Sequence, residues 1–414
     1  MQSGSPNSVI IRWRTDTAVN SVVKYGISTG SLTSQAENFE LTTEHEIKLS
    51  SLAANTKYYY SVGSSTEDLA SGPMYFFLTG PQEGTPKKTR VWVIGDSGTD
   101  DDDQRNVRDS YYSFTGTTET NLWVMLGDNA YDDGTDEEYQ DAVFEVYDDL
   151  LRNSVLWPAF GNHDGHSAES PTESGPFYDI FSLPANAEAG GLASGTEAYY
   201  SFNYSNIHFI CLNLEDINGF LYDEMFDWLQ SDLAQNKLTW TVAFWHHPPY
   251  SKGSHDSDDS SSLRRMREKA LPILENGGVD LVLTGHSHSY ERSYLLDGHY
   301  DDSETLSSEM ILDNGDGNVN GDGAYQKPSL GPASHEGAVY IVAGSSGKTS
   351  GGDLDHPAMY LSLNVLGSVV LDFDNSELNI TFLNDSAEIL DQFTMQKGTN
   401  SSQPRPPLNI NIRP

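Results

Sequence analysis

Five short apolar segments of this 414-residue chain stop abruptly at a side chain that can bind a metal ion. Each segment is rich in β-prone residues, as expected for a buried strand. The polar residues that follow the segments are Asp96, Asp128, Asn162, His246 and His286. In sheets whose strands alternate with helices, binding sites form beyond the carboxyl ends of the strands. The pattern therefore predicts an α/β domain in which five strand ends meet at one metal-binding rim.

The second of these strand ends, Gly127–Tyr131, places a carboxylate and a phenol three residues apart. A phenol is a good metal ligand only when it is deprotonated, which requires a hard and highly charged cation. One carboxylate can also bridge two metal ions whose charges would otherwise repel each other. Taken alone, the segment is more typical of a Gly-Asp turn beside a core tyrosine. Because similar strand ends recur along the chain, the metal site is the favoured interpretation.

The polar strand ends also carry an ordered set of motifs. The motifs are Asp96–Gly98, Gly127–Tyr131, Gly161–Asp164, His246 and Gly285–His288. In this order they resemble those of the calcineurin-like metallophosphoesterases, and Tyr131 makes the chain similar to the purple acid phosphatases within that group. The resemblance implies an α/β four-layer αββα sandwich for the domain that carries the motifs.

The resemblance implies ligands for two metal ions that share one carboxylate. The first ion would take Asp96, Asp128, Tyr131 and His288. The second ion would take Asp128, Asn162, His246 and His286. The first set is anionic and rich in oxygen, which suits Fe(III), whereas the second suits a divalent Fe, Zn or Mn ion.

The resemblance also assigns two catalytic histidines on the substrate side of the metals. His163 and His255 match the positions in the family that serve the leaving group of the ester. Many plant members carry a second histidine after the position of His255, where this chain has Asp256. This departure argues against transferring the substrate preference or the acid pH range of the plant enzymes. Weaker candidates at the rim are His166 and His356.

Three further residues near the motifs are interpreted as structural. His247 follows the expected ligand His246 and would point away from it along the strand. Glu291 and Arg292 follow the last motif, and we expect them to pair with each other beneath the site.

The activity that the resemblance implies is hydrolysis of phosphate monoesters by a metal-bound hydroxide. Such a reaction needs no protein nucleophile, which agrees with the lack of a convincing Ser-His-Asp or Cys-His arrangement in the sequence. Two alternatives stay open. The same site fits a phosphodiesterase or nucleotidase, and the chain also fits a non-catalytic surface-binding protein in which the metals only hold the fold.

The first 82 residues have a different pattern from the rest. Short β-prone segments such as Val9–Trp13 and Ser21–Gly26 alternate with turn residues, which is typical of an all-β sandwich. This part is similar to the fibronectin-III-like domain that precedes the catalytic domain in larger purple acid phosphatases. We expect an N-terminal domain at residues 1–82, a metallophosphoesterase domain at 90–397 and a disordered linker or tail at 398–414.

Two segments of the larger domain show helical periodicity. Residues 136–152 place four apolar side chains on one helical face, namely Tyr139, Val143, Val146 and Leu150. A second helix is expected to begin near Ser260–Ser262 and to stop near Gly277.

The chain has 61 acidic and 23 basic residues, for a net charge of −38. It has no basic stripe to displace counterions, so a nucleic-acid backbone is excluded as the main partner. An acidic surface suits a saline setting, where screening over ~8–10 Å weakens self-repulsion. The partners that the family resemblance implies are small phosphate esters.

The cysteine content and the length of the apolar segments constrain the cellular location of the protein only in part. The single cysteine, Cys211, lies in an apolar run and is expected to be a buried, inert thiol. No apolar run approaches ~18 residues, so we expect no membrane span. No signal peptide is visible and the chain looks trimmed ahead of its first strand. The expectation is an extracellular or periplasmic protein.

Two glycine-rich loops stand apart from the motifs. The Asp316–Asp322 loop matches the first half of an EF-hand calcium loop, but Lys327 stands where a bidentate glutamate belongs. A solvated turn is therefore favoured over calcium binding there. Gly344–Lys348 follows another strand but lacks the spacing of a P-loop, and it is expected near the same pocket.

Overall fold

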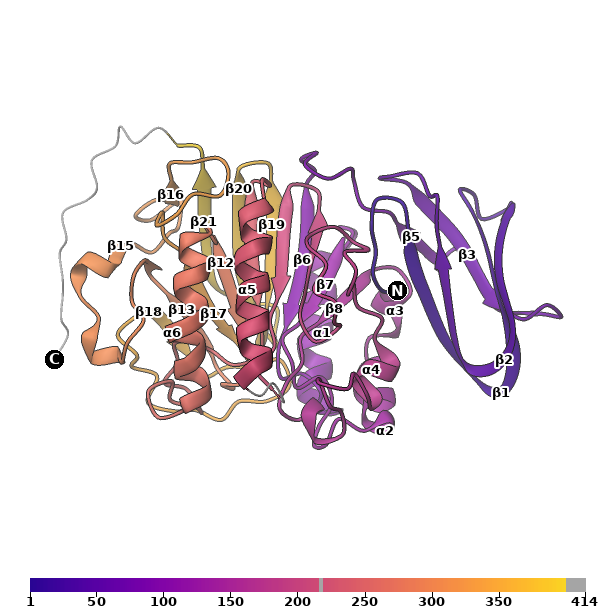
Figure 1. Ribbon diagram of the computed structural model, residues 1–414, viewed down its shortest axis with the longest axis horizontal. Helices are drawn as coiled ribbons and strands as arrows, with labels where there is room; N and C mark the ends of the chain where they lie inside the picture. Colours follow the sequence, from indigo (N-terminus) through magenta and orange to yellow (C-terminus); the bar gives the residue numbers. More distant parts are fainter. Residues whose placement is uncertain (216–218, 400–414) are drawn as a thin grey trace.

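The structure, a computed structural model, describes residues 1–215 and 219–399. An antiparallel β domain at the N-terminus is followed by a larger α/β domain (Figure 1). The N-terminal strands pair in the order β2-β1-β3-β4, with β5 beside β3. They are β1 (Val9–Gly26), β2 (Ser34–Leu49), β3 (Lys57–Gly63), β4 (Asp68–Ala70) and β5 (Phe76–Leu78).

The first strand is longer than the sequence pattern indicates. Val9–Trp13 and Ser21–Gly26, expected as separate strands, are the two halves of β1, and the register against β2 shifts between them. Such an irregularity bends a strand. Val9 and Val23, one from each half, enter the same core, so the sheet folds over on itself. The predicted all-β sandwich is confirmed.

The described residues of the larger domain form two seven-stranded sheets and one two-stranded sheet. The first large sheet runs β16 (Tyr325–Lys327), β21 (Ile389–Lys397), β20 (Glu377–Asn384), β19 (Gly367–Asp374), β6 (Thr89–Ile94), β7 (Leu122–Met125) and β8 (Val155–Pro158). The second runs β18 (Met359–Leu363), β13 (Tyr290–Ser293), β17 (Val339–Ala343), β12 (Leu281–Thr284), β11 (Trp240–Phe244), β10 (Ile207–Cys211) and β9 (Tyr200–Tyr204). The small sheet pairs β14 (Leu295–Leu296) with β15 (Ile311–Asp313).

The two large sheets pack face to face through aromatic pairs. Trp157 of β8 stacks on Phe202 of β9 with ring centroids 3.7 Å apart. Tyr290 of β13 stacks on Phe382 of β20 at 3.9 Å. Each pair joins one sheet to the other, and apolar residues of both sheets form one continuous core.

Helices cover the outer faces of the two sheets. On the first sheet, Tyr111 of α1 (Asp102–Thr115) stacks on Trp92 at 4.4 Å. On the second, α5 (Gly219–Gln235) and α6 (Ser261–Asn276) lie side by side (Figure 1), and they share a core with its strands. The predicted four-layer αββα sandwich is confirmed, and α6 confirms the helix expected after Ser260.

The helix expected over residues 136–152 is interrupted. α2 (Asp136–Tyr139) runs into a π-helical turn at Gln140–Glu145, and α3 (Asp148–Leu151) begins after a break at Tyr147. A π turn holds more residues than an α turn, which changes the direction of the side chains that follow. The four predicted apolar residues are buried, and Tyr147, outside the predicted face, is buried with them. A further short helix, α4, spans Pro176–Ile180.

The strand directions decide where polar loops can meet. β6, β7 and β8 are parallel neighbours in the first sheet, and β10, β11, β12 and β17 are parallel neighbours in the second. Since the sheets face each other, the loops that follow β6, β7, β8, β11 and β12 gather at one rim. The structure thus forms the rim that the five polar strand ends predict.

The N-terminal domain contacts the larger domain beside α2 and α3. The Tyr60 hydroxyl donates to the Arg152 carbonyl at 2.9 Å, and Arg14 pairs with Asp136. No helix in the described part of the chain is long and apolar enough to cross a membrane. The predicted tail, 398–414, lies outside the described residues from position 400 onward.

Candidate metal centre

All seven side chains predicted as metal ligands lie together at the rim between the two sheets. Asp96, Asp128 and Asn162 follow β6, β7 and β8 of the first sheet. His246, His286 and His288 come from the loops after β11 and β12 of the second sheet. A chain of contacts shorter than 4 Å joins them, with Tyr131 included.

The first predicted set is rich in oxygen. The Tyr131 hydroxyl lies 3.2 Å from Asp96 Oδ1 and 3.0 Å from Asp128 Oδ2. His288 completes the set, with its Nε2 3.5 Å from Asp96 Oδ1. Burial and the neighbouring carboxylates of Asp96 and Asp128 raise the pKa of Tyr131 well above its ordinary value. Only a strongly charged cation would therefore hold Tyr131 as a phenolate.

The second predicted set is rich in nitrogen. His246 Nε2 lies 3.0 Å from Asn162 Oδ1 and 3.3 Å from Asp128 Oδ1, and His286 Nδ1 lies 3.2 Å from His246 Nε2. Asp128, His246 and His286 each offer a ligand atom within 4.8 Å of the others. These are donors and spacings that suit a divalent transition metal.

The electrostatic field around His246 favours a cation. Burial alone would lower the pKa of His246, but the carboxylates of Asp128 and Asp96 outweigh it and raise that pKa to about 10. A site that favours an imidazolium so strongly has a negative potential, which a metal cation would neutralise. The seven predicted ligands, with Asp128 shared between the two sets, thus lie together as a binuclear metal site would require.

Three of the predicted ligands adopt left-handed backbone. The φ angles are 53° at Asp96, 51° at Asp128 and 64° at His286, and each of these residues follows a glycine. Such conformations cost about 1–3 kcal/mol each in non-glycine residues and cluster at functional sites. The abrupt turn after each strand explains why the sequence changes there from apolar to polar residues.

Glycines let the ligand loops approach one another. A Cβ at Gly161 would lie 2.1 Å from the Asp128 backbone nitrogen, and one at Gly285 would lie 2.4 Å from Asp96 Oδ2. Either contact would push apart two loops that carry ligands. The glycine in each of these motifs is therefore a packing requirement of the centre.

Backbone and side-chain acceptors orient the ligands. His246 Nδ1 donates to the Leu126 carbonyl at 2.9 Å, which leaves Nε2 free to face the centre. Asp164 accepts from the Gly161 amide at 2.8 Å and from the Asn129 side chain at 2.9 Å, so it ties two ligand loops together. Burial, with Asp128 nearby, raises the pKa of Asp164 to about 7. Sequence reasoning placed this acid in a motif but gave it no role.

The two predicted catalytic histidines flank the ligands from different sides. His163 Nδ1 contacts the Asp132 carbonyl at 2.5 Å, and its Nε2 lies 3.9 Å from Asp128 Oδ2. The exposed His255 stacks on His286 with ring centroids 3.9 Å apart. Both residues are brought to the centre. Their catalytic roles remain a prediction.

The other histidines near the motifs lie in more ordinary surroundings. His247 Nε2 pairs with Glu215 at 3.0 Å, and its ring contacts the rings of His246 and His286. His356 is buried, and burial lowers its pKa to about 3, so it is a core residue. His166 contacts Asp133 at the rim.

The pairing expected between Glu291 and Arg292 is wrong. Arg292 pairs instead with Asp391 at 2.6 Å, and Glu291 accepts hydrogen bonds from Ser251 and Ser289. Adjacent residues of a strand point to opposite faces, so these two side chains on β13 cannot meet.

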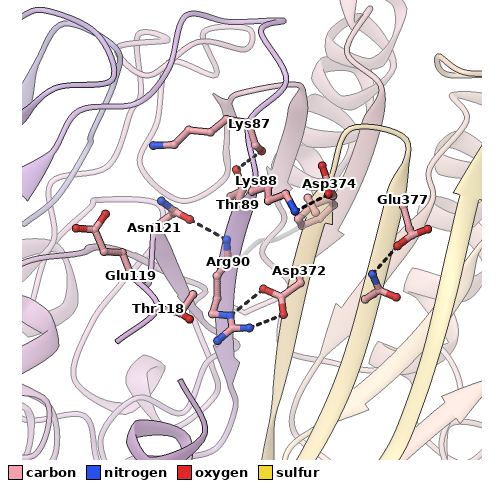
Figure 2. A pocket seen from close by; sticks show the side chains of 12 residues that line it. Lys87, Lys88, Thr89, Arg90, Thr118, Glu119, Asn121, Asp372, Asp374 and Glu377 are labelled. Carbon is pink, nitrogen blue, oxygen red and sulfur yellow. Dashed lines mark hydrogen bonds and ion pairs between the residues drawn. The ribbon is translucent and has the colours of Figure 1, made fainter. Parts of the chain in front are cut away.

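One surface pocket and the calcium-like loop have their charged groups engaged in contacts of their own. A surface pocket of about 550 Å³ lies at the opposite end of β6. Figure 2 shows two ion pairs in it, Lys88 with Asp374 and Arg90 with Asp372. In the calcium-like loop, Asp316 accepts from the backbone of Asn318 and Asp322. Lys327, at its twelfth position, points into the core toward Asp280.

A second group of possible ligands joins Glu275, Asp297 and His335 at the far end of α6. The buried Glu275 carboxylate already accepts from the Tyr300 and Tyr340 hydroxyls, both at 2.5 Å, and from the Gly298 amide at 2.8 Å. These bonds satisfy the carboxylate without a cation, which favours a structural role.

Two family models together match most of the chain. The model for calcineurin-like phosphoesterases matches residues 89–290, and the model for the N-terminal domain of purple acid phosphatases matches residues 1–79. The fold and the ligand set thus define a metallophosphoesterase with an accessory β domain.

Individual relatives narrow the class further. Purple acid phosphatase 15 of Arabidopsis thaliana is 27% identical over 322 residues, covering 67% of this chain and 57% of that protein. The Fe(3+)-Zn(2+) purple acid phosphatase 12 of the same plant is 26% identical over 309 residues, covering 69% and 62%. A structure of a purple acid phosphatase from yellow lupin seeds superposes with a TM-score of 0.70 at 18% identity, covering 96% of this chain and 73% of that one. The chain belongs to the purple acid phosphatases, and it spans about 60% of the length of these two plant relatives.

Proposed function

We propose that the protein hydrolyses phosphate monoesters at a centre of two metal ions. The position of Asp128 carries the proposal. Its Oδ2 lies 3.0 Å from the Tyr131 hydroxyl, and its Oδ1 lies 3.3 Å from His246 Nε2. One carboxylate shared by an oxygen-rich set and a nitrogen-rich set is what a two-metal phosphoryl-transfer site requires.

The donor chemistry supports two different ions. Fe(III) suits the set with Asp96, Tyr131 and His288, and a divalent Zn, Fe or Mn ion suits the set with Asn162, His246 and His286. The relative named for Fe(3+) and Zn(2+) supports such a pair. When bound, the two cations supply positive charge for the phosphoryl oxygens and acidify water.

The chain's own residues hold the ligands in place and handle the proton. Leu126 and Asp164 fix the orientation of ligands through the bonds described above. His163 turns Nδ1 toward the Asp132 carbonyl, which directs Nε2 to the centre. A proton held on His163 or His255 would serve the alkoxide that departs from phosphorus.

A monoester is favoured over a diester on charge. A phosphate monoester carries about two negative charges at neutral pH, and two cations flanked by two histidines match that charge better than the single charge of a diester. Phosphodiesterase or nucleotidase activity on the same site stays the alternative, and the relative rates on an ester panel decide between them.

The test compares metal dependence with ester preference. Metal-stripped protein is reconstituted with Fe(III) and Zn(II) and assayed on 4-nitrophenyl phosphate, bis(4-nitrophenyl) phosphate and a nucleoside monophosphate. His286→Ala should abolish hydrolysis of every ester, whereas the control His335→Ala, which removes a histidine from the remote group near Glu275, should leave it intact. Faster hydrolysis of the diester would favour the phosphodiesterase alternative, and hydrolysis confined to the nucleoside monophosphate would favour the nucleotidase. Unchanged activity in His286→Ala would contradict the proposed centre.

A further inference from the structure

A lysine lies over the ring of the tyrosine predicted to bind the first metal. Lys348 Nζ is 3.5 Å from the centroid of the Tyr131 ring. An ammonium at this distance over a tyrosine face makes a cation–π contact. The contact would strengthen if Tyr131 became a phenolate, because the ring would then carry more negative charge.

The loop that carries Lys348 is tied to ligand loops on two sides. Before the lysine, the Ser346 amide donates to the Gly95 carbonyl at 3.1 Å, next to Asp96. After it, Ser350 contacts His288 Nδ1 at 2.7 Å. Because the loop is fixed on both sides, the position of the lysine is part of the architecture of the centre.

Lys348 has no carboxylate within ion-pair distance among residues 1–215 and 219–399. Lys88, for comparison, pairs with Asp374 at 2.9 Å even on the surface. The aromatic face of Tyr131 is thus the partner that the structure provides for this ammonium.

We propose that Lys348 is a positioning residue that tunes the electronic properties of Tyr131 as a metal ligand. The proposal rests on the proposed function, because it takes Fe(III) as the ion at the first site. A positive charge over the ring lowers the energy of the phenolate π electrons. The charge-transfer transition from phenolate to Fe(III) then needs more energy, and the visible band lies at shorter wavelength. The same charge favours the lower oxidation state of iron.

The experiment uses the full chain loaded with Fe(III) and Zn(II), with iron content measured in every sample. Lys348→Met keeps the length of the side chain and removes its charge, while Lys348→Arg keeps the charge. We expect the visible band of Lys348→Met at longer wavelength than in the wild type, and the iron reduction potential to be lower. Lys348→Arg should keep both the band and the reduction potential close to the wild-type values. The control Lys88→Met removes the same charge at the opposite end of β6 and should change neither.

The outcomes separate this proposal from the proposed function. Tyr131→Phe should abolish the visible band of the wild type. If it does, but the band does not move in Lys348→Met, the role of the lysine is overturned and the metal centre still stands. An iron-loaded wild type without a band would overturn the assignment of iron to Tyr131, and this proposal with it. Loss of iron from both Lys348→Met and Lys348→Gln would also contradict tuning, because the lysine would then hold the loop.

Discussion

Three predicted ligands of the metal centre hold a backbone conformation that ordinarily belongs to glycine. Asp96, Asp128 and His286 all follow a glycine and turn sharply at the end of a parallel strand. The strain of about 1–3 kcal/mol at each residue is offset by the packing of two sheets that hold the loops. We therefore expect single residues at this rim to have separable tasks: fixing the loops, binding metal, and facing the substrate.

The two flanking histidines test that separation. His163→Ala and His255→Ala should each retain both metals, since neither residue belongs to the ligand sets. Turnover should fall by ~10²–10⁴-fold, the usual contribution of a positioned acid, and the loss should be smaller for aryl phosphates, whose leaving oxygen hardly needs a proton. Steady-state kinetics with alkyl and aryl esters, alongside metal analysis, measure this. Metal loss in either variant, or equal losses for both ester classes, would contradict the assigned role.

At the scale of elements, the end of α6 is held by a buried carboxyl group. Glu275 lies near the last turn of α6 and accepts from Tyr300, Tyr340 and Gly298. Burial raises the pKa of Glu275 from 4.5 to about 7. Between these values the folded chain keeps a proton that the unfolded chain has lost.

This carboxyl group should make stability fall as pH rises. Its contribution is fully present below about pH 4.5 and is lost by about pH 7, with a total on the order of 3 kcal/mol. Glu275→Gln cannot titrate, so the free energy of unfolding of the wild type relative to the variant should fall over this window. Denaturant unfolding at several pH values measures it, with the exposed Glu304→Gln as control. If the difference in the free energy of unfolding between the wild type and Glu275→Gln does not depend on pH, Glu275 titrates with its ordinary pKa.

Local patterns predicted the elements that lead to the centre, and distant contacts account for the parts that they missed. A strand that ends at a polar residue is visible in the sequence, and this pattern predicts five polar strand ends at one rim. The resemblance to the family supplies the full set of seven ligands. The π turn after α2 depends on tertiary packing, and periodicity gave no sign of it. Arg292 contacts Asp391, 99 residues away, and Lys348 contacts Tyr131 across the rim. No short-range spacing predicts such pairs.

At the scale of the whole molecule, the dominant property is a net charge of −38. Such a surface repels itself at low ionic strength, and screening relieves the repulsion. The contacts between the two domains include the ion pair of Arg14 with Asp136.

Salt should therefore stabilise the fold. Between ~0.1 M and ~1 M NaCl the screening length falls from ~10 Å to ~3 Å, and the free energy of unfolding should rise over that range. KCl should give the same curve, because the effect is screening and not binding of a particular cation. Urea unfolding at fixed pH and fixed metal content measures it. Stability that is unchanged or lower in salt would show that the acidic surface does not limit the fold.

The central claim is that two metal ions, sharing Asp128, carry out phosphate ester hydrolysis. The most direct measurement is a titration of metal-stripped protein with Fe(III) and Zn(II), following hydrolysis of 4-nitrophenyl phosphate against metal bound per chain. The account predicts that activity appears only as the second ion binds and reaches a plateau at two ions per chain. Full activity with one ion or none, or no hydrolysis with two ions bound, would contradict it.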